Sequence, residues 1–170
     1  NECFFLLNLK GEGVPEVISF GKNSQYYILI MELLGKSLET LIDEKGNFPI
    51  QVVCLIAIQI ISRLEHVHSK YIIHRDIKPG NFLIGLNNPS LIYIIDFGLS
   101  RKYRSSSTKK HLEYNKINKI YGSINFASLN SHEGLEVSRR DDLESLGYML
   151  IYMYNGKLPW EKYEQEEISF

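Results

Sequence analysis

The sequence is poor in cysteine, with only Cys3 and Cys54 among 170 residues. Two such cysteines provide neither the ligand spacing of a zinc site nor the disulfide framework of a small secreted domain. Both lie in apolar runs, CFFLL and VVCLIAI, so we expect them to be small buried hydrophobic side chains. The low cysteine content favours a reducing compartment, and we expect an intracellular protein of the cytoplasm, the nucleus or both.

An excess of charge of one sign is also missing, because 19 Lys and Arg residues are balanced by 20 Asp and Glu residues. We therefore expect neither nucleic acid nor an anionic membrane surface as a partner. No apolar run reaches the roughly 18 residues of a membrane-spanning helix. Glu2 precedes the first apolar run, which is unlike a signal peptide, and a start at Asn1 rather than Met suggests a fragment, a processed form or an incomplete gene model.

What the sequence does contain is the composition of one folded domain, with 44% hydrophobic and 23% charged residues. Up to residue 48 its patterns predict a helix over 2–9, a hairpin of strands 16–20 and 25–33 around the turn 21–24, and a short helix capped by Ser37.

A long helix is predicted over residues 49–69. Its apolar residues nearly encircle it, so we expect it to lie inside a core. We expect short strands at 71–73, 82–84 and 91–95 and a helix over 141–154 that ends at Asn155-Gly156. Residues 98–138 show no clear period, and long segments of this kind are commonly functional.

Two charged islands interrupt the short strands. The first reads His74-Arg75-Asp76-Ile77-Lys78-Pro79-Gly80-Asn81, and the second reads Asp96-Phe97-Gly98, twenty residues beyond Asp76. Either island alone is more often a solvated turn than a site. In this order, with Asn81 five residues after Asp76 and a strand pair between the islands, they match the catalytic-loop and metal-loop signatures of protein kinases.

Phosphoryl transfer explains these residue types. A carboxylate must accept or orient the proton of the substrate hydroxyl, which fits Asp76, and Mg²⁺ requires oxygen ligands, which fits Asp96 and the Asn81 amide oxygen. Lys78 would stabilise charge on the γ-phosphate of ATP. Phe97 would pack inside to fix its loop, while Gly98 would let the backbone turn.

The resemblance extends to a particular family. The stretches MELLGKSLETL, HSKYIIHRDIKPGNFLIG, YIIDFGLSRKY and SRRDDLESLGYMLIYMYNGKLPW, with SLN at 128–130, resemble the casein kinase I family of Ser/Thr protein kinases from near residue 2 to about Trp160. This resemblance implies roles for eight further residues: Met31 as gatekeeper, Glu32 and Leu34 as hinge groups for adenine, Ser37 near the ribose, Leu83 beneath the adenine, Ile95 at the pocket border, Asp142 as a buried support of the catalytic loop and Glu2 as the helix glutamate.

The sequence also departs from this family. Asn125 stands in place of an arginine that helps bind an anion near the substrate, so the usual preference for acidic or phosphorylated substrates is expected to weaken unless Lys119, Arg139 and Arg140 compensate. Thr40 and Gly80 each replace an acidic residue. Ser105–Thr108 could accept phosphate and pair with Arg75, but a plain solvated loop is the favoured interpretation.

The resemblance implies an α+β, protein-kinase-like fold in which residues 1–34 end a small lobe and its hinge and residues 35–170 form an incomplete, mainly helical large lobe. The expected function is ATP- and Mg²⁺-dependent phosphorylation of protein Ser/Thr hydroxyls. No Gly-rich loop and no strand lysine precede Asn1, so we expect the 170-residue chain alone to be poorly active. The alternatives are a non-catalytic binding or scaffold pseudokinase and a gene remnant, and the oligomeric state is not predicted.

Overall fold

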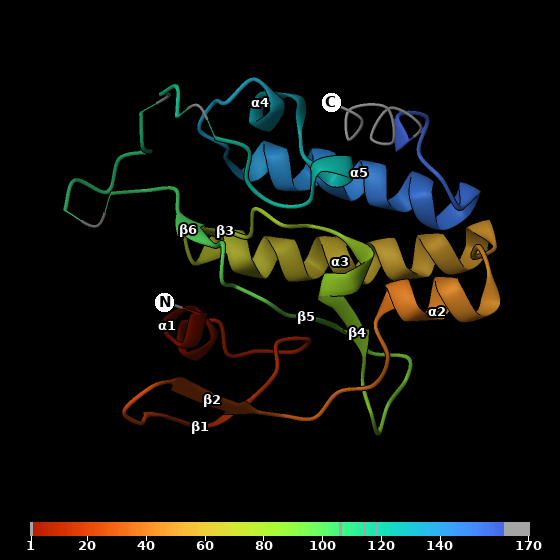
Figure 1. Ribbon diagram of the computed structural model, residues 1–170, viewed down its shortest axis with the longest axis horizontal. Helices are drawn as coiled ribbons and strands as arrows, with labels where there is room; N and C mark the ends of the chain where they lie inside the picture. The colour runs from red at the N-terminus through yellow and green to blue at the C-terminus, as the bar shows by residue number, and fades with distance from the viewer. Residues whose placement is uncertain (1, 106, 114, 118, 162–170) are drawn as a thin grey trace.

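Two long antiparallel-packed helices, α3 and α5, form the centre of the fold (Figure 1). The computed structural model describes residues 2–105, 107–113, 115–117 and 119–161. In chain order its elements are α1 (Glu2–Asn8), β1 (Val17–Lys22), β2 (Tyr27–Met31), α2 (Leu38–Lys45), α3 (Ile50–Ser69), β3 (Ile72–Ile73), η1 (Pro79–Asn81), β4 (Phe82–Ile84), β5 (Ile92–Ile94), β6 (Arg101–Lys102), η2 (Ile124–Phe126), α4 (Leu129–His132) and α5 (Arg139–Asn155).

The helix predicted over 49–69 is confirmed as α3, but the expectation that a core surrounds it is wrong. One face contributes buried residues at helical spacing to the core: Val53, Ile56, Ile60, Leu64 and Val67. The opposite face leaves Leu55 64% and Ile58 66% exposed. An apolar composition shows that a helix could be covered on all sides, whereas its actual burial depends on which neighbours pack against it.

The length and hydropathy of α3 would also allow it to cross a membrane, which corrects the expectation that no segment is apolar enough. This test uses composition alone, and a core helix passes it equally well. Here Arg63 lies buried in the middle of the helix and pairs with Glu12, and five neighbouring apolar residues belong to the hydrophobic core. These contacts account for the apolar residues on one face of α3, while those on the opposite face remain exposed.

Antiparallel pairing of β4 with β5 brings the two charged islands together. Phe82 pairs with Ile94, so β4 begins and β5 ends at the same edge of this two-stranded sheet. The island 74–81 directly precedes β4, and the island 96–98 follows closely after β5. The predicted strands at 71–73, 82–84 and 91–95 are thereby confirmed, and their pairing places both islands at one end of the fold.

The predicted hairpin is confirmed as β1 and β2, which pair antiparallel and lie with α1 on the side of α3 away from α5 (Figure 1). The loop after α1 is fixed to α3 by side chains. Arg63 donates from Nη2 to Glu12 at 2.7 Å and from Nε to the Ile92 carbonyl at 3.3 Å, and His66 bonds the Leu9 carbonyl at 2.8 Å. The guanidinium of Arg63 therefore links the loop that follows α1 to strand β5.

The segment 98–138 contains short elements that periodicity did not reveal. β6 pairs with β3, and η2 and α4 follow near the amino end of α5. Besides local turns, its backbone makes bonds distant in sequence, such as those from the Tyr103 amide to the Tyr71 carbonyl and from the Ile117 amide to the Gly134 carbonyl. Such contacts depend on tertiary structure, so they leave no local repeat in the sequence.

The two cysteines are less buried than expected. Cys54 is exposed and Cys3 half-buried, so the prediction of two buried cysteines is wrong.

The helix predicted over 141–154 is confirmed as α5, which is capped by Gly156 in the left-handed region at φ 76°. Apolar residues remain exposed along one side of α5, at Leu143, Ile151 and Tyr154.

Candidate active site

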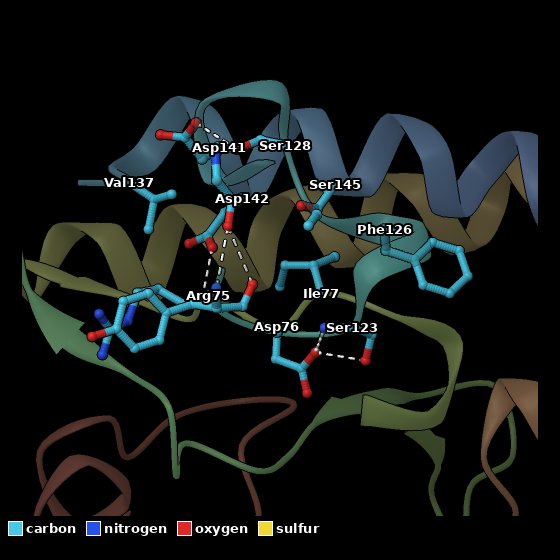
Figure 2. A pocket seen from close by; sticks show the side chains of 14 residues that line it. Arg75, Asp76, Ile77, Ser123, Phe126, Ser128, Val137, Asp141, Asp142 and Ser145 are labelled. Atoms are coloured by element: carbon cyan, nitrogen blue, oxygen red, sulfur yellow. Dashed lines mark hydrogen bonds between the residues drawn. The ribbon is translucent and has the colours of Figure 1, made fainter. Parts of the chain in front are cut away.

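The first charged island forms a buried turn held by α5. Arg75 has a φ of 70°, a conformation that non-glycine residues seldom adopt. Asp142, which is 2% exposed, accepts the backbone N–H groups of His74 and Arg75, each at 2.9 Å. Figure 2 shows Asp142 above Arg75. Its carboxylate also bonds His68 Nε2 at 2.8 Å. This carboxylate therefore fixes the backbone that presents Asp76.

The Asp76 carboxylate lies at the centre of a hydrogen-bond network and is 7% exposed. Ser123 donates to Asp76 Oδ1 from its amide at 2.9 Å and from its hydroxyl at 3.0 Å (Figure 2). Lys78 Nζ lies 3.0 Å from Asp76 Oδ2, and Asn81 Nδ2 donates to the same oxygen at 3.0 Å. The carboxylate is thus surrounded by donors that favour its ionised form.

The pKa of Asp76 is lowered from its ordinary value. Burial alone would raise this pKa, but the hydrogen bond and charge of Lys78 and the hydrogen bonds of Ser123 outweigh burial. Asp76 is therefore ionised at neutral pH. A buried, ionised carboxylate with an adjacent lysine can orient a hydroxyl group and accept its proton.

The second island presents Asp96 close to the first. Asp96 is exposed, has a φ of 61° and accepts the Gly98 amide at 3.1 Å. Phe97 is fully buried, with its ring 5.0 Å from the His74 ring, as expected for a residue that fixes the loop. The Ile95 amide donates to the Asn81 carbonyl at 3.0 Å, so the backbones of both islands are joined directly.

The oxygen atoms available where the two islands meet fit the ligands of a magnesium ion. Asn81 uses its amide nitrogen toward Asp76, which leaves the amide oxygen for a cation, and Asp96 adds an exposed carboxylate. Over the described ranges there is no cluster of three or more His, Cys, Asp or Glu residues suited to a metal. Two oxygen ligands suffice for Mg²⁺ when waters and substrate phosphates complete its octahedron.

Glu2 of α1 faces the second island. Burial, followed by the negative charge of Asp96, raises the pKa of Glu2, while a hydrogen bond from the Phe97 backbone opposes this shift. The structure thus places the residue assigned as the helix glutamate beside the candidate metal loop.

The residues assigned to the nucleotide lie along the connection between β2 and α2. Ser37 caps α2 by accepting the Thr40 amide at 3.0 Å and forms a bridge with Leu83 of β4. The Glu32 amide donates to the Glu16 carbonyl at 2.8 Å, and its side chain accepts from Tyr93. In the described part of the chain, no backbone partner is found for the Glu32 carbonyl or the Leu34 amide, so both predicted hinge residues retain a backbone group for a ligand.

A close approach at Gly35 joins this connection to β4. The Gly35 amide donates to the Ile84 carbonyl at 2.8 Å, and a Cβ added to Gly35 would meet Ile84 at 2.8 Å. Only glycine fits here without a shift of the chain. Leu83 lies in β4 beside this contact and two residues after Asn81, and Ile95 lies between β5 and Asp96.

The sequence alone did not identify Ser123 as a partner of Asp76. The two residues are 47 positions apart, and no local pattern relates them. A pocket behind Asp76 is lined by residues of both segments (Figure 2), but its volume of about 10 Å³ is barely that of one water molecule. A cavity of this size cannot hold a substrate.

A buried, ionised carboxylate beside a lysine, joined to a second loop with oxygen ligands for a cation, is a phosphotransferase arrangement. The family model described as Protein kinase domain matches residues 1–169. The chain therefore belongs to the protein kinase family, and its mixed helix and strand content agrees with that fold.

Proposed function

We propose that this chain carries the catalytic centre of a protein serine/threonine kinase of casein kinase I type. Asp76, Lys78 and Asn81 are its catalytic residues, and Asn81 and Asp96 are its Mg²⁺ ligands. The observation that carries the proposal is the Asp76 carboxylate, held ionised by Lys78 and Ser123 next to Asn81. A turn that was merely solvated would not hold its carboxylate at 7% exposure among four donor contacts.

In the proposed reaction, the oxygen of a substrate Ser or Thr attacks the γ-phosphorus of ATP while the bond to the β,γ-bridging oxygen breaks. Asp76 orients the attacking hydroxyl and takes its proton, and ADP leaves with the electron pair of the broken bond. Lys78 lies close enough to Asp76 to neutralise charge on the transferred group. A bound Mg²⁺ would supply charge neutralisation at the phosphates, held by Asn81 and Asp96.

Selectivity for Ser and Thr, and the casein kinase I type, rest on the sequence resemblance together with the contacts of Ser123. Ser123 Oγ accepts from Lys78 at 3.0 Å and donates to Asp76, and Lys78 contacts Asp76 in turn, so the three side chains form a closed ring of contacts. The nucleotide residues proposed are Glu32, Leu34, Ser37, Leu83 and Ile95. Residues 1–34 are proposed to end a small lobe and hinge, and residues 35–170 to belong to a large lobe.

Protein kinases act on proteins, so the partners are protein substrates. The proposed change in substrate preference concerns Asn125, whose carbonyl accepts from Trp160 Nε1 at 2.9 Å. An Asn at this position offers no fixed positive charge for an acidic or phosphorylated substrate. Replacing Asn125 by Arg in the natural protein is expected to strengthen that preference, and an unchanged ranking of peptides would contradict it. We also propose an intracellular location, which rests on the low cysteine content of the sequence.

The function is tested by the Asp76→Asn variant of the natural protein that contains this chain. We expect transfer of labelled phosphate from ATP to Ser/Thr substrates to fall by about 10²- to 10⁴-fold, with nucleotide affinity by calorimetry unchanged. Asp43→Asn, at an exposed site on α2, is the matched control and should leave the rate unchanged. If the unaltered protein binds nucleotide but transfers no phosphate, the non-catalytic alternative is correct.

A further inference from the structure

Arg75 follows His74 in the catalytic turn, and its guanidinium has protein partners on several sides. Its side chain is 9% exposed, and Nε donates to the Leu99 carbonyl at 2.6 Å. The centre of the Tyr121 ring lies 4.1 Å from Arg75 Cζ, within the range of a cation–π contact. Glu136 adds a carboxylate 4.0 Å from Arg75 Nη1. Among the residues that the structure describes, Arg75 Nη1 and Glu136 Oε1 are buried without a hydrogen-bond partner, so the charge on this side of the guanidinium is opposed by the 4.0 Å ion pair and by the Tyr121 ring.

Two further cations, Arg101 and Lys119, contact the Glu136 and Tyr121 side chains that also contact Arg75. Arg101 Nη1 pairs with Glu136 Oε2 at 2.6 Å, and Lys119 Nζ lies 5.0 Å from the centre of the Tyr121 ring. Arg75 and Lys119 therefore both contact Tyr121, while Arg75 and Arg101 share Glu136. This cluster joins three segments: the catalytic turn, the region of β6 and residues 119–136.

The position of Tyr121 connects this cluster to Asp76. Gly122 follows at a φ of 83° and passes so close to the Arg75 carbonyl that an added Cβ would collide with it. Ser123 comes next and donates both of its hydrogen bonds to Asp76 Oδ1. The chain thus runs in three residues from the ring stacked on Arg75 to the hydroxyl that holds the candidate base.

Ser105, Ser107 and Thr108 lie in a separate loop. Ser105 Oγ bonds Ser107 Oγ at 3.0 Å, and the Thr108 amide donates to Ser105 Oγ at 3.2 Å. Their described contacts are with one another and with the neighbouring backbone. A phosphate on such a loop orders a kinase when it pairs with an arginine that lacks a counter-charge, whereas Arg75 already has the Glu136 carboxylate and the Tyr121 ring beside it.

We propose that Tyr121 is a positioning residue that, by stacking on Arg75, holds Gly122 and Ser123 against Asp76 without any phosphate on the 105–108 segment. The role of Asp76 rests on the proposed function, whereas the stacking and its effect on Ser123 do not. Tyr121 supplies the flat surface and Glu136 the negative charge that a phosphate would otherwise bring to the guanidinium. Removing the ring should therefore free Ser123 and leave Arg75 with an unmatched charge.

Hydrogen exchange of the Ser123 amide, followed by NMR, tests whether loss of the ring frees Ser123, and it does not require enzyme activity. We expect Tyr121→Ala and Tyr121→Leu to speed its exchange by at least about 10-fold, because the hydrogen bond to Asp76 opens more often. Tyr121→Phe keeps the stacked ring and should stay within about 3-fold of the unaltered chain. Tyr71→Ala removes a comparable stack, with Arg104 at 4.6 Å, away from Asp76 and should leave Ser123 unchanged.

Addition of an oxyanion tests whether loss of the ring leaves the charge of Arg75 without a partner. Sulfate stabilises proteins in general, so thermal stabilisation by sodium sulfate over sodium chloride is compared between variants at equal ionic strength. Tyr121→Leu should gain more from sulfate than the unaltered chain and Tyr71→Ala, and should regain protection at Ser123. The proposal is overturned if Ser123 exchange does not respond to loss of the ring, or if sulfate stabilises all three proteins equally.

Independence from phosphate is tested in the natural protein by replacing Ser105, Ser106, Ser107 and Thr108 with alanine together. The proposal predicts a transfer rate within about 2-fold of the unaltered protein, since Arg75 needs no added anion. A loss of more than about 10-fold would overturn it. If the natural protein transfers no phosphate at all, the proposed function fails, while the exchange and sulfate measurements still decide the role of Tyr121.

Discussion

Asp142 accepts the backbone N–H of Arg75 at 2.9 Å while Arg75 is held at a φ of 70°. A non-glycine residue in this region costs about 1–3 kcal/mol and persists only where surrounding contacts fix it. The strained turn lies immediately before Asp76, so the support from α5 determines where the carboxylate points. Stability of the turn and placement of the candidate base are therefore linked through one buried side chain.

Replacing Asp142 by alanine is expected to destabilise the chain by at least about 3 kcal/mol in urea unfolding. The change removes the acceptor for the amides of His74 and Arg75 and for the ring of His68. Asp43→Ala, at an exposed position, should change the free energy of unfolding by less than about 0.5 kcal/mol. Equal effects of the two variants would show that Asp142 does not support the turn.

Gly122→Ala is expected to lower the free energy of unfolding by at least about 1–3 kcal/mol, because Gly122 is in the left-handed region and faces the Arg75 carbonyl. Gly21→Ala in β1 is the matched control, since open space surrounds that position. The control should be neutral or slightly stabilising by about 0.5 kcal/mol. Guanidinium titration of both variants measures the difference, and a neutral Gly122→Ala would contradict the close approach.

Asp96→Asn is expected to weaken the Mg²⁺-dependent part of nucleotide binding by at least about 10-fold in the natural protein, because a carboxylate ligand is lost. Binding measured by calorimetry with EDTA in place of Mg²⁺ should be the same in both proteins. Glu133→Gln, an exposed acidic residue after α4, controls for the change in net charge. An Asp96→Asn variant that still responds fully to Mg²⁺ would exclude Asp96 as a ligand.

Stability is expected to fall at high pH through Tyr148. Burial and the hydrogen bond to Glu144 raise the pKa of Tyr148 to about 12 from an ordinary value of 10.0. Because the folded pKa is the higher one, this contribution is complete below pH 10 and is lost as the pH rises toward 12. The loss should be about 1 kcal/mol after allowing for solvent screening of a partly exposed pair.

The comparison for this pH effect is Tyr148→Phe, which cannot ionise at this position. Unfolding free energies measured between pH 9 and 12 should decline less steeply for Tyr148→Phe than for the unaltered chain. Other groups that titrate in the range, such as lysines, affect both proteins equally. Parallel curves would show that the folded and unfolded states share the same pKa at Tyr148.

The sequence identified the parts of this fold that follow local rules. The apolar spacing in 49–69, the hairpin around 21–24 and the cap at Ser37 each depend on residues within one helical turn or one strand pair. The order of the islands containing Asp76 and Asp96 likewise indicated a kinase-type site from the sequence alone.

The remaining features depend on contacts across long stretches of chain. Nothing in the spacing of Ser123 indicated that it bonds Asp76, because the two segments meet where each packs against α5. The exposure of Cys54 and Leu55 was also missed. An apolar pattern shows which residues favour burial, but the neighbours that would cover them are set by the tertiary structure.

The link between Arg63 and Glu12 has a consequence for the order in which the chain folds. α1 has only seven residues, too few to persist as an isolated helix. Its attachment to α3 joins residues 51 positions apart, so closing that loop must follow formation of the helix that carries Arg63. We therefore expect α1 to dock after the transition state for folding. Glu12→Gln should speed unfolding in stopped-flow experiments while leaving the refolding rate nearly unchanged.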